Sequence, residues 1–245
     1  MPRTQRTEEQ TRRLVADAVV EHVARHGIDA VPDVPMERIL QDAGVSRASA
    51  YRIWSGRSAF RAFALEQCAA GHAMQTLDPA RARELAEEAL AAENDRLHSA
   101  AHFVTTAAAE ELALMLRSDR WRAFVAFQAV ALHTSSPEIA ETLARIDRQD
   151  VGRLSAFYSG VADAWSLDLL GGTTVEDVAS AALLVARSTV ARAVAGTDVA
   201  RARTTYLTAL GALVRGSFRA RPGADADLGR LLVGPAGVQQ GGDAQ

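Results

Sequence analysis

Residues 44–54, GVSRASAYRIW, hold the densest group of side chains that could bind an anion. Hydroxyl and guanidinium groups donate hydrogen bonds, and the guanidinium fork matches the oxygens of a phosphate. Tyrosine and tryptophan add an apolar body with a polar edge. The alternative is a small packed corner, in which the rings are core and the cations meet only water. The residues concerned are Ser46, Arg47, Ala48, Ser49, Tyr51, Arg52 and Trp54.

Two histidine pairs have the spacing of metal ligands on a helix, but nothing completes a site. His22 with His26 and His98 with His102 are each four residues apart, yet neither has a third ligand close by in the sequence or an HExxH pattern. We therefore expect no metal and no cofactor. The sequence also shows no glycine-rich phosphate loop, no GxSxG elbow and no carboxylate pair with a separate base. We expect that the protein is not an enzyme.

The composition predicts an all-α protein. The 245 residues are 48% apolar and 23% charged, as in ordinary globular proteins. Alanine and leucine dominate, and alternating β-branched runs are missing. The longest uncharged run, 123–137, is too short and too polar to span a bilayer, and the N-terminus has no apolar signal segment. The single cysteine, Cys68, excludes an internal disulfide. We expect a cytoplasmic protein with no membrane partner.

The net charge of −3 is unevenly distributed. Residues 1–61 carry ten arginines and eight acidic residues, whereas the remainder carries 17 arginines and 22 acidic residues. A basic N-terminal part is what a nucleic-acid contact requires, but this bias is mild. The charge distribution is therefore compatible with a nucleic-acid contact but does not predict one.

Helix signals surround the 44–54 stretch. Thr7 and Gln10 form a capping box for a first helix that ends at Gly27. Pro35 suits the first turn of a second helix, which ends at Gly44. Ser46 can cap a third helix, and a fourth runs from about Ser58 to about Met74.

Two helices joined by a short glycine-containing turn are the plan of a helix-turn-helix. In this plan the second of the two helices lies in the major groove of DNA. Its polar side chains would touch phosphates and base edges, while Val45, Ile53 and either Ala48 or Ala50 would pack inward.

Helical periodicity continues beyond residue 75. We expect helices over residues 79–97, 121–132, 136–165, 173–196 and 198–220. The tail, 222–245, is rich in Gly, Ala, Asp and Gln and is predicted to be disordered.

Residues about 8–63 resemble the DNA-binding domain of TetR-type transcriptional regulators. The resemblance rests on Gly27, AGVS at 43–46, Tyr51, Trp54 and SGRSAF at 55–60. It covers under a quarter of the chain, with tight spacing and complete order. It implies a helix-turn-helix DNA-binding domain over residues 1–63. A larger helical ligand-binding and dimerisation domain would follow over residues 64–221.

The resemblance assigns roles residue by residue. Tyr51 and Arg57 match phosphate-contacting positions, and Arg47 and Ser49 match base-reading positions. Arg52, Arg3 and Arg6 could add phosphate contacts, although the two arm residues could equally be solvated. The second helix departs from the family, because Pro35 stands where a threonine or serine usually binds phosphate. Ala48, Ala50 and Trp54 replace a common glycine, leucine and phenylalanine.

The resemblance further implies a homodimer on a near-palindromic operator of double-stranded DNA. The last two helices would pair with their twofold mates as a four-helix bundle; alternatively their apolar stripes pack only within their own chain. The expected interface residues are Ala179, Leu183, Ala186, Val190, Leu207, Leu210, Leu213 and Phe218.

Aromatic residues gather between positions 103 and 165 and could line a pocket for a small apolar or aromatic effector. The alternative is plain core. The candidates are His102, Phe103, Trp121, Phe124, Phe127, Gln128, Phe157, Tyr158 and Trp165.

The sequence thus favours a ligand-responsive DNA-binding regulator, with repression as the family's habit. The second interpretation is a helical ligand-binding or interaction module that has lost DNA binding, and its support is Pro35.

Overall fold

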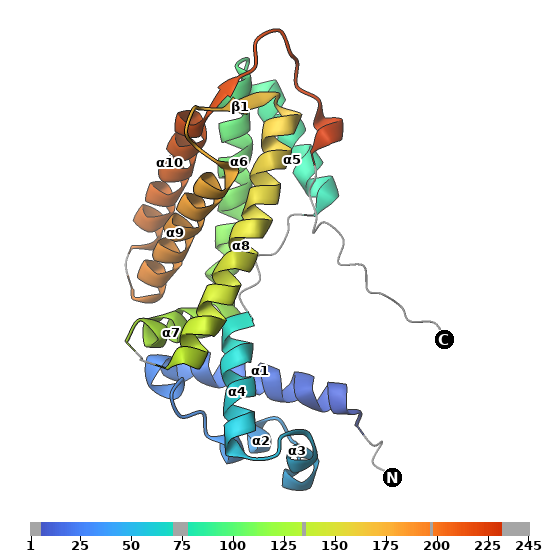
Figure 1. Cartoon of the computed structure of the whole chain (residues 1–245), viewed down its shortest axis with the longest axis vertical. Coiled ribbons are helices and arrows are strands. Elements are labelled where there is room, and N and C mark those ends of the chain that lie inside the picture. Colours follow the sequence, from blue (N-terminus) through green and yellow to red (C-terminus); the bar gives the residue numbers. More distant parts are fainter. Residues whose placement is uncertain (1–5, 71–77, 134–135, 197, 232–245) are drawn as a thin grey trace, which may run out of the picture. The chain divides into compact units, whose positions relative to one another are not determined.

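The computed structural model describes residues 6–70, 78–133, 136–196 and 198–231. In these residues the chain is helical apart from one pair of short strands, which confirms the predicted all-α class (Figure 1). None of the described helices combines the length and the apolar character that crossing a bilayer requires.

The chain forms two compact units. Unit 1 comprises Met1–Ala73 and Met115–Arg148, and unit 2 comprises Met74–Leu114 and Gln149–Gln245. This division differs from a boundary after residue 63, because α7 (Asp119–His133) packs against α1 (Glu8–His26) and α4 (Arg57–Ala70). A helix from the middle of the sequence therefore belongs to the N-terminal unit.

Helix α1 begins with the predicted capping box. The Gln10 amide donates to the Thr7 hydroxyl over 3.2 Å, and the Thr7 amide donates to the Gln10 side chain over 3.0 Å. Val15, Val19 and Val23 lie on one face of the helix and are completely buried. A 3₁₀ turn, η1 (Gly27–Ala30), follows α1.

Helices α2 (Met36–Asp42) and α3 (Arg47–Ile53) form the predicted helix-turn-helix. Pro35 is the N-cap of α2 and makes no side-chain capping bond, so it precedes the first turn in which it was expected. Gly44 has a φ of +61°, a backbone conformation that favours glycine. The Val45 amide then donates to the Leu40 carbonyl over 2.9 Å, which closes the turn and fixes where α3 starts.

Unit 2 contains α5 (Pro79–Ala92), α6 (Arg96–Met115) up to Leu114, and α8 (Pro137–Ala164) from Gln149 onward. The prediction of a single helix over 79–97 is wrong, because the helix is interrupted between Ala92 and Arg96. Glu93 is extended, and the Asp95 carboxylate accepts the His98 amide at 2.9 Å, which starts a new helix. An aspartate that bonds a nearby amide in this way competes with helix continuation.

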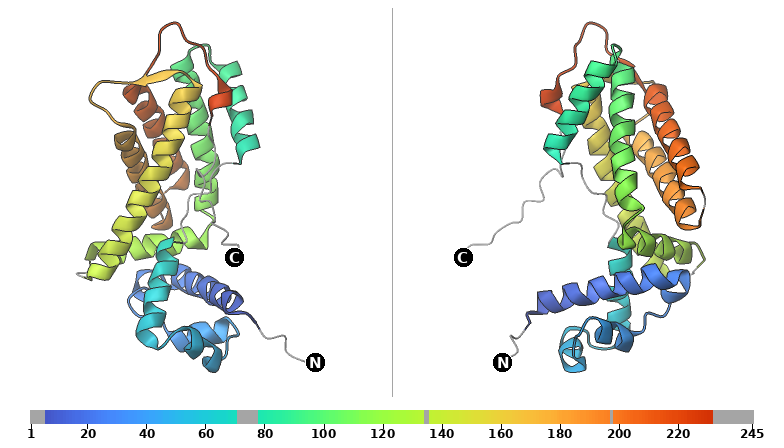
Figure 2. Two further views of the ribbon diagram at one scale, coloured as in Figure 1. Left: turned by 45° about the vertical axis from the view of Figure 1, so that its right-hand side comes forward. Right: turned by 180° about the vertical axis from the view of Figure 1, so that it is seen from behind.

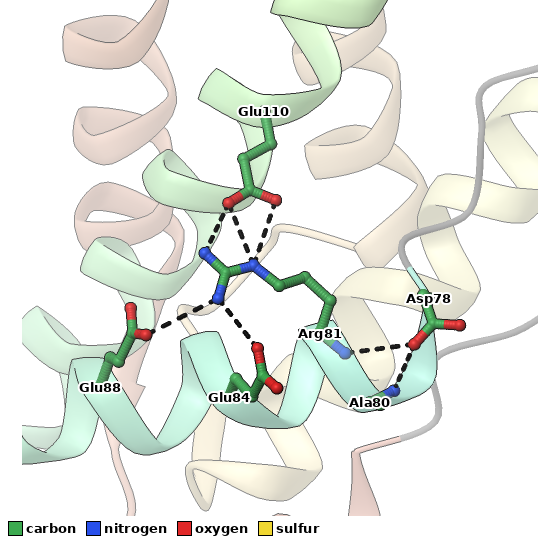
Figure 3. A network of polar contacts seen from close by, with 6 residues as sticks. All are labelled: Asp78, Ala80, Arg81, Glu84, Glu88 and Glu110. Carbon is green, nitrogen blue, oxygen red and sulfur yellow. Dashed lines mark hydrogen bonds and ion pairs between the residues drawn. The ribbon is translucent and has the colours of Figure 1, made fainter.

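Arg81 joins α5 to α6. Its guanidinium lies between Glu110 of α6 and two glutamates of its own helix, Glu84 and Glu88 (Figure 3). The Nη2–Oε1 distance to Glu110 is 2.7 Å, and the Nη1–Oε2 distance to Glu84 is 3.0 Å. These bonds, that to Glu110 first, raise the pKa of the Arg81 guanidinium above its already high ordinary value.

Helices α9 (Val175–Val194) and α10 (Val199–Ser217) lie side by side (Figures 1 and 2). The last helix ends three residues before the expected Ala220. Strands β1 (Leu167–Leu169) and β2 (Phe218–Ala220) pair antiparallel, with Leu167 opposite Ala220. The alanine-rich and leucine-rich sequence did not predict this two-stranded ribbon.

The prediction of a disordered tail over residues 222–245 is corrected for residues 222–231. The Asp227 amide donates to the Ala164 carbonyl over 2.7 Å, and the Ser166 hydroxyl donates to the Asp225 carbonyl over 2.7 Å. A 3₁₀ turn, η2 (Leu228–Arg230), ends the described chain. These bonds join the stretch to Ala164 at the end of α8 and to Ser166, which gives this polar stretch a defined path. Residues 232–245 lie outside the described residues.

Candidate nucleic-acid interface

The predicted cap fixes the first turn of α3. The Ser46 hydroxyl accepts the Ser49 amide at 3.2 Å and donates to the Ser49 hydroxyl over 2.9 Å. The helix therefore starts at Arg47. Arg52 Nη2 lies 3.4 Å from the Ser49 hydroxyl, so the two serines and this arginine form one polar cluster.

One face of α3 is open to solvent and the other is buried. Tyr51 is 50% exposed, and Arg47, Ala48 and Arg52 are exposed as well. Ala50 is completely buried. Of the two alanines considered for packing, Ala50 is therefore the one that faces inward. The outward face carries hydrogen-bond donors, one phenol and no acidic residue.

Trp54 is a core residue: its apolar body packs inward as expected, but its polar edge does not face outward toward a phosphate. It is only 3% exposed, and its ring packs against Phe60 and Phe63, with centroids 5.6 Å and 4.9 Å away. The Arg12 guanidinium lies over the ring, 5.7 Å from its centroid. The indole N–H has no acceptor among the described residues. A side chain held in this way contributes packing and cannot reach a phosphate on the surface.

Glu37 is the polar partner that sequence reasoning missed. Its carboxylate forms an ion pair with the Arg47 guanidinium and so joins the first turn of α2 to the first turn of α3. Ten positions separate the two residues, and the turn between them brings them together. No helical spacing in the sequence signals such a pair.

Two further arginines flank the helix-turn-helix. Arg6 Nη1 donates to the Gly44 carbonyl over 2.8 Å, which places this arginine against the turn. Arg57 is exposed at the first position of α4. Arg3 lies outside the described residues. The expected phosphate-contacting arginines that are described therefore lie on the arm, on α3 and at the start of α4.

The candidate effector residues fall into two sets, one in each unit. Trp121, Phe124 and Phe127 belong to α7 in unit 1 and are at most 4% exposed. Gln128, on the same helix, is half-buried. Phe103, Phe157, Tyr158 and Trp165 belong to unit 2, where His102 is exposed.

The rings of the unit 2 set contact one another. Phe103 stacks on Trp165 and Phe157 with centroids 5.0 Å and 6.0 Å away, and the Trp165 indole N–H donates to the buried Ser99 hydroxyl over 2.8 Å. Burial, and then Tyr206, raises the pKa of Tyr158 above its ordinary value. Burial, and then Glu111, does the same for the pKa of Tyr206. Polar groups from α6, α8 and α10 thus meet beside an aromatic core.

Most of the expected dimer residues are covered within their own chain. Leu207 and Leu213 are half-buried and remain available to a partner. Leu184 of α9, which was not singled out, is 70% exposed. The others are buried within the chain, where α9 and α10 pack against each other. These covered residues, at most 4% exposed, are Ala179, Leu183, Ala186, Val190, Leu210 and Phe218.

The histidines of the two pairs contact other groups of the protein. The His22 and His26 rings stack with centroids 4.4 Å apart, and His26 Nδ1 lies 2.9 Å from the His22 carbonyl. Burial, and then His26, lowers the pKa of His22. His98 Nδ1 lies 2.9 Å from an Asp95 oxygen. Within the described residues, no three His, Cys, Asp or Glu side chains are grouped as metal ligands.

The fold is shared with solved regulators. A TetR-family transcriptional regulator from Streptomyces coelicolor superimposes with a TM-score of 0.52 at 14% identity, over 85% of this chain and 96% of that chain. A protein from a Rhodococcus species assigned to the same family gives a TM-score of 0.57 at 15% identity, over 84% of this chain and 99% of that chain. No protein-family model matches the sequence, and no curated protein matches it. At these identities the likeness shows the fold.

Proposed function

We propose that the protein is a DNA-binding transcriptional regulator of the TetR type, most simply a repressor released by a small effector. The observation that carries the proposal is the division of α3 into two faces. Arg47, Tyr51 and Arg52 point to solvent, while Ala50 is buried beneath them. A capped helix with donors on its outward face, presented by a tight turn, is what the major groove admits.

The proposed roles follow exposure. Tyr51, Arg52, Arg57 and Arg6 contact phosphates and set the register of the protein on the duplex. Arg47 and Ser49 read base edges. The Ser49 hydroxyl is already bonded to Ser46, so its contact with a base requires an exchange of partners.

The homodimer is part of the proposal. Two copies would place their α3 helices in successive major grooves, about 34–36 Å apart, on a near-palindromic operator. We assign the interface to the outward sides of α9 and α10, where Leu184, Leu207 and Leu213 keep exposed surface. An isologous contact of this kind buries the same residues of both copies.

The effector site is proposed within unit 2. Its aromatic core, with Tyr158, Tyr206 and Glu111 nearby, supplies an apolar lining with few polar groups. An apolar or aromatic effector would enter by separating rings that now contact one another. Binding would then favour a dimer whose α3 helices are spaced wrongly for the operator.

DNA binding tests the proposal directly. The purified full chain is mixed with fragmented DNA from its own genome, and the bound fragments are sequenced. We expect a near-palindromic site whose affinity falls about 10³-fold or more between 50 mM and 200 mM salt. Arg47→Ala should weaken binding to that site by about 10-fold to 100-fold, and Tyr51→Ala should weaken all duplexes alike.

Arg83→Ala provides the matched control, because it removes an exposed arginine from α5 in unit 2. It should bind as the wild type does. Pro35 at the start of α2 has neither a hydroxyl nor an amide for phosphate, and this favours the second candidate, a helical ligand-binding or interaction module. Failure of the wild type to enrich any sequence at low salt would support that candidate and refute DNA binding.

A further inference from the structure

We propose that Glu37 is a positioning residue for Arg47, and that it sets base specificity at the operator position that Arg47 reads. The inference rests on the proposed function, since it concerns the same interface. It assigns a role to an acidic side chain on a surface otherwise suited to bind an anion.

The geometry places the pair at the junction of α2 and α3. Arg47 is the first residue of α3, and side chains of a helix lean toward its N-terminus, here toward α2. Glu37 lies in the first turn of α2, and its carboxylate meets the Arg47 guanidinium. Both line one open hollow of about 400 Å³ between the two helices, together with Arg38, Leu40, Gln41 and Val45.

The pair is not needed to hold α2 and α3 together. The Arg47 and Glu37 side chains are 73% and 46% exposed, and ion pairs this open to water contribute little to stability. The junction is already secured by buried Ile39 and Leu40 and by the Val45–Leu40 backbone bond. A carboxylate among phosphate-binding groups also opposes general attraction to DNA. The role that remains for the Glu37 carboxylate is an effect on Arg47 itself.

Hydrogen-bonding capacity supplies that effect. A guanidinium has five N–H donors, and a guanine takes two of them through O6 and N7. Glu37 can therefore keep its bond while Arg47 contacts the base. An arginine that is already held loses less rotamer freedom on binding, and its fork meets the base in one orientation. The expected consequence is sharper discrimination together with weaker attraction to DNA of any sequence.

The test uses Glu37→Gln with Asp42→Asn as its matched control. Asp42 also lies on α2 and pairs with an exposed arginine, Arg38, at 3.1 Å. Each variant removes one negative charge, but only Glu37→Gln alters a group bonded to Arg47. The probes are a duplex library with a random centre, then the enriched site and all of its single-base variants. Each is titrated at 50, 100 and 200 mM salt with wild type, both variants, and Arg47→Ala with and without Glu37→Gln.

We expect Glu37→Gln to lose about 3-fold to 10-fold of the preference for guanine at the position of each half-site where Arg47→Ala loses all preference. Binding to unrelated duplexes should strengthen equally in both acidic-site variants, because both remove the same charge. In Arg47→Ala, adding Glu37→Gln should change no base preference further. This absence of an added effect is a readout that a merely structural role would not give.

Three results would overturn the inference while leaving the proposed function intact. Glu37→Gln could keep the full base preference, it could strengthen specific and unrelated duplexes alike, or Asp42→Asn could lose the same preference. A wild type that enriches no sequence would instead refute the proposed function, and the inference with it.

Discussion

At the scale of single residues, solvent exposure distinguishes two aromatic side chains that the sequence motif does not distinguish. Tyr51 and Trp54 are three positions apart in the motif, yet they are 50% and 3% exposed. The difference arises because Trp54 ends α3 in an extended conformation, which turns its ring toward Phe60 and Phe63. Tyr51 stays on the helix face that the neighbouring elements leave open. One aromatic residue is therefore a candidate contact, and the other is core.

Cys68 gives a prediction at the same scale. Burial in α4 raises the pKa of its thiol from an ordinary 9.0 to about 12. Because the folded-state pKa lies above the unfolded-state pKa, the stabilisation is complete below pH 9 and is lost as the pH rises toward 12. The thiol contribution to the free energy of unfolding should fall by about 1.4 kcal/mol per pH unit in that window.

Urea unfolding of wild type and Cys68→Ala from pH 7 to pH 11, under reducing conditions, measures this contribution. The difference between the two proteins cancels other titrating groups, including Tyr158 and Tyr206. It should be constant up to about pH 9 and then shrink. A constant difference up to pH 11 would show that the thiol is solvated in the folded state.

At the scale of elements, the starts of α1 and α3 were predictable, whereas the break between α5 and α6 was not. The caps at Thr7 and Ser46 depend on residues within three positions, so the sequence contains the whole interaction. The end of α8 depends on distant residues. Arg96, at the start of α6, donates to the Trp165, Ser166 and Arg221 carbonyls over 3.3, 3.3 and 2.6 Å.

Removing this clamp should destabilise unit 2. Arg96→Ala leaves three carbonyls without their charged donor, and we expect a loss of about 1–3 kcal/mol in the free energy of unfolding. Arg96→Lys keeps a cation near the end of α8 but lacks the fork, so its loss should be smaller. Thermal and urea unfolding followed by circular dichroism provide the measurement. Equal losses in the two variants would mean that the fork geometry is unimportant.

At the scale of the whole molecule, the proposed dimer depends on surface that the single chain leaves apolar. Leu184 of α9 is 70% exposed, whereas the neighbouring Leu183 is 4% exposed. One leucine therefore completes the fold of its own chain, and the other is free to meet a second copy. The covered alanines of α9 bring helices of the same chain together.

Leu184→Glu should weaken self-association without unfolding the protein. A glutamate in the proposed apolar interface would bury an unpaired charge in each copy, so the dimer dissociation constant should rise at least about 10-fold. Leu132→Glu, at a 79% exposed leucine of α7, is the control and should leave the constant unchanged. Sedimentation velocity over a concentration series measures both. A wild type that is monomeric throughout would contradict the homodimer, and equal effects of the two variants would contradict the assigned face.

The sequence by itself determined the all-α class, the capped start of α3 and the tight turn at Gly44, because each depends on residues close along the chain. It also identified the arginines and the tyrosine around α3. Only the tertiary structure decided which of these side chains face solvent, that Trp54 is core, and that Glu37 meets Arg47. It likewise showed that most predicted dimer residues are already covered. These outcomes depend on which distant helix covers a given face, and periodicity identifies an apolar face without identifying what packs on it.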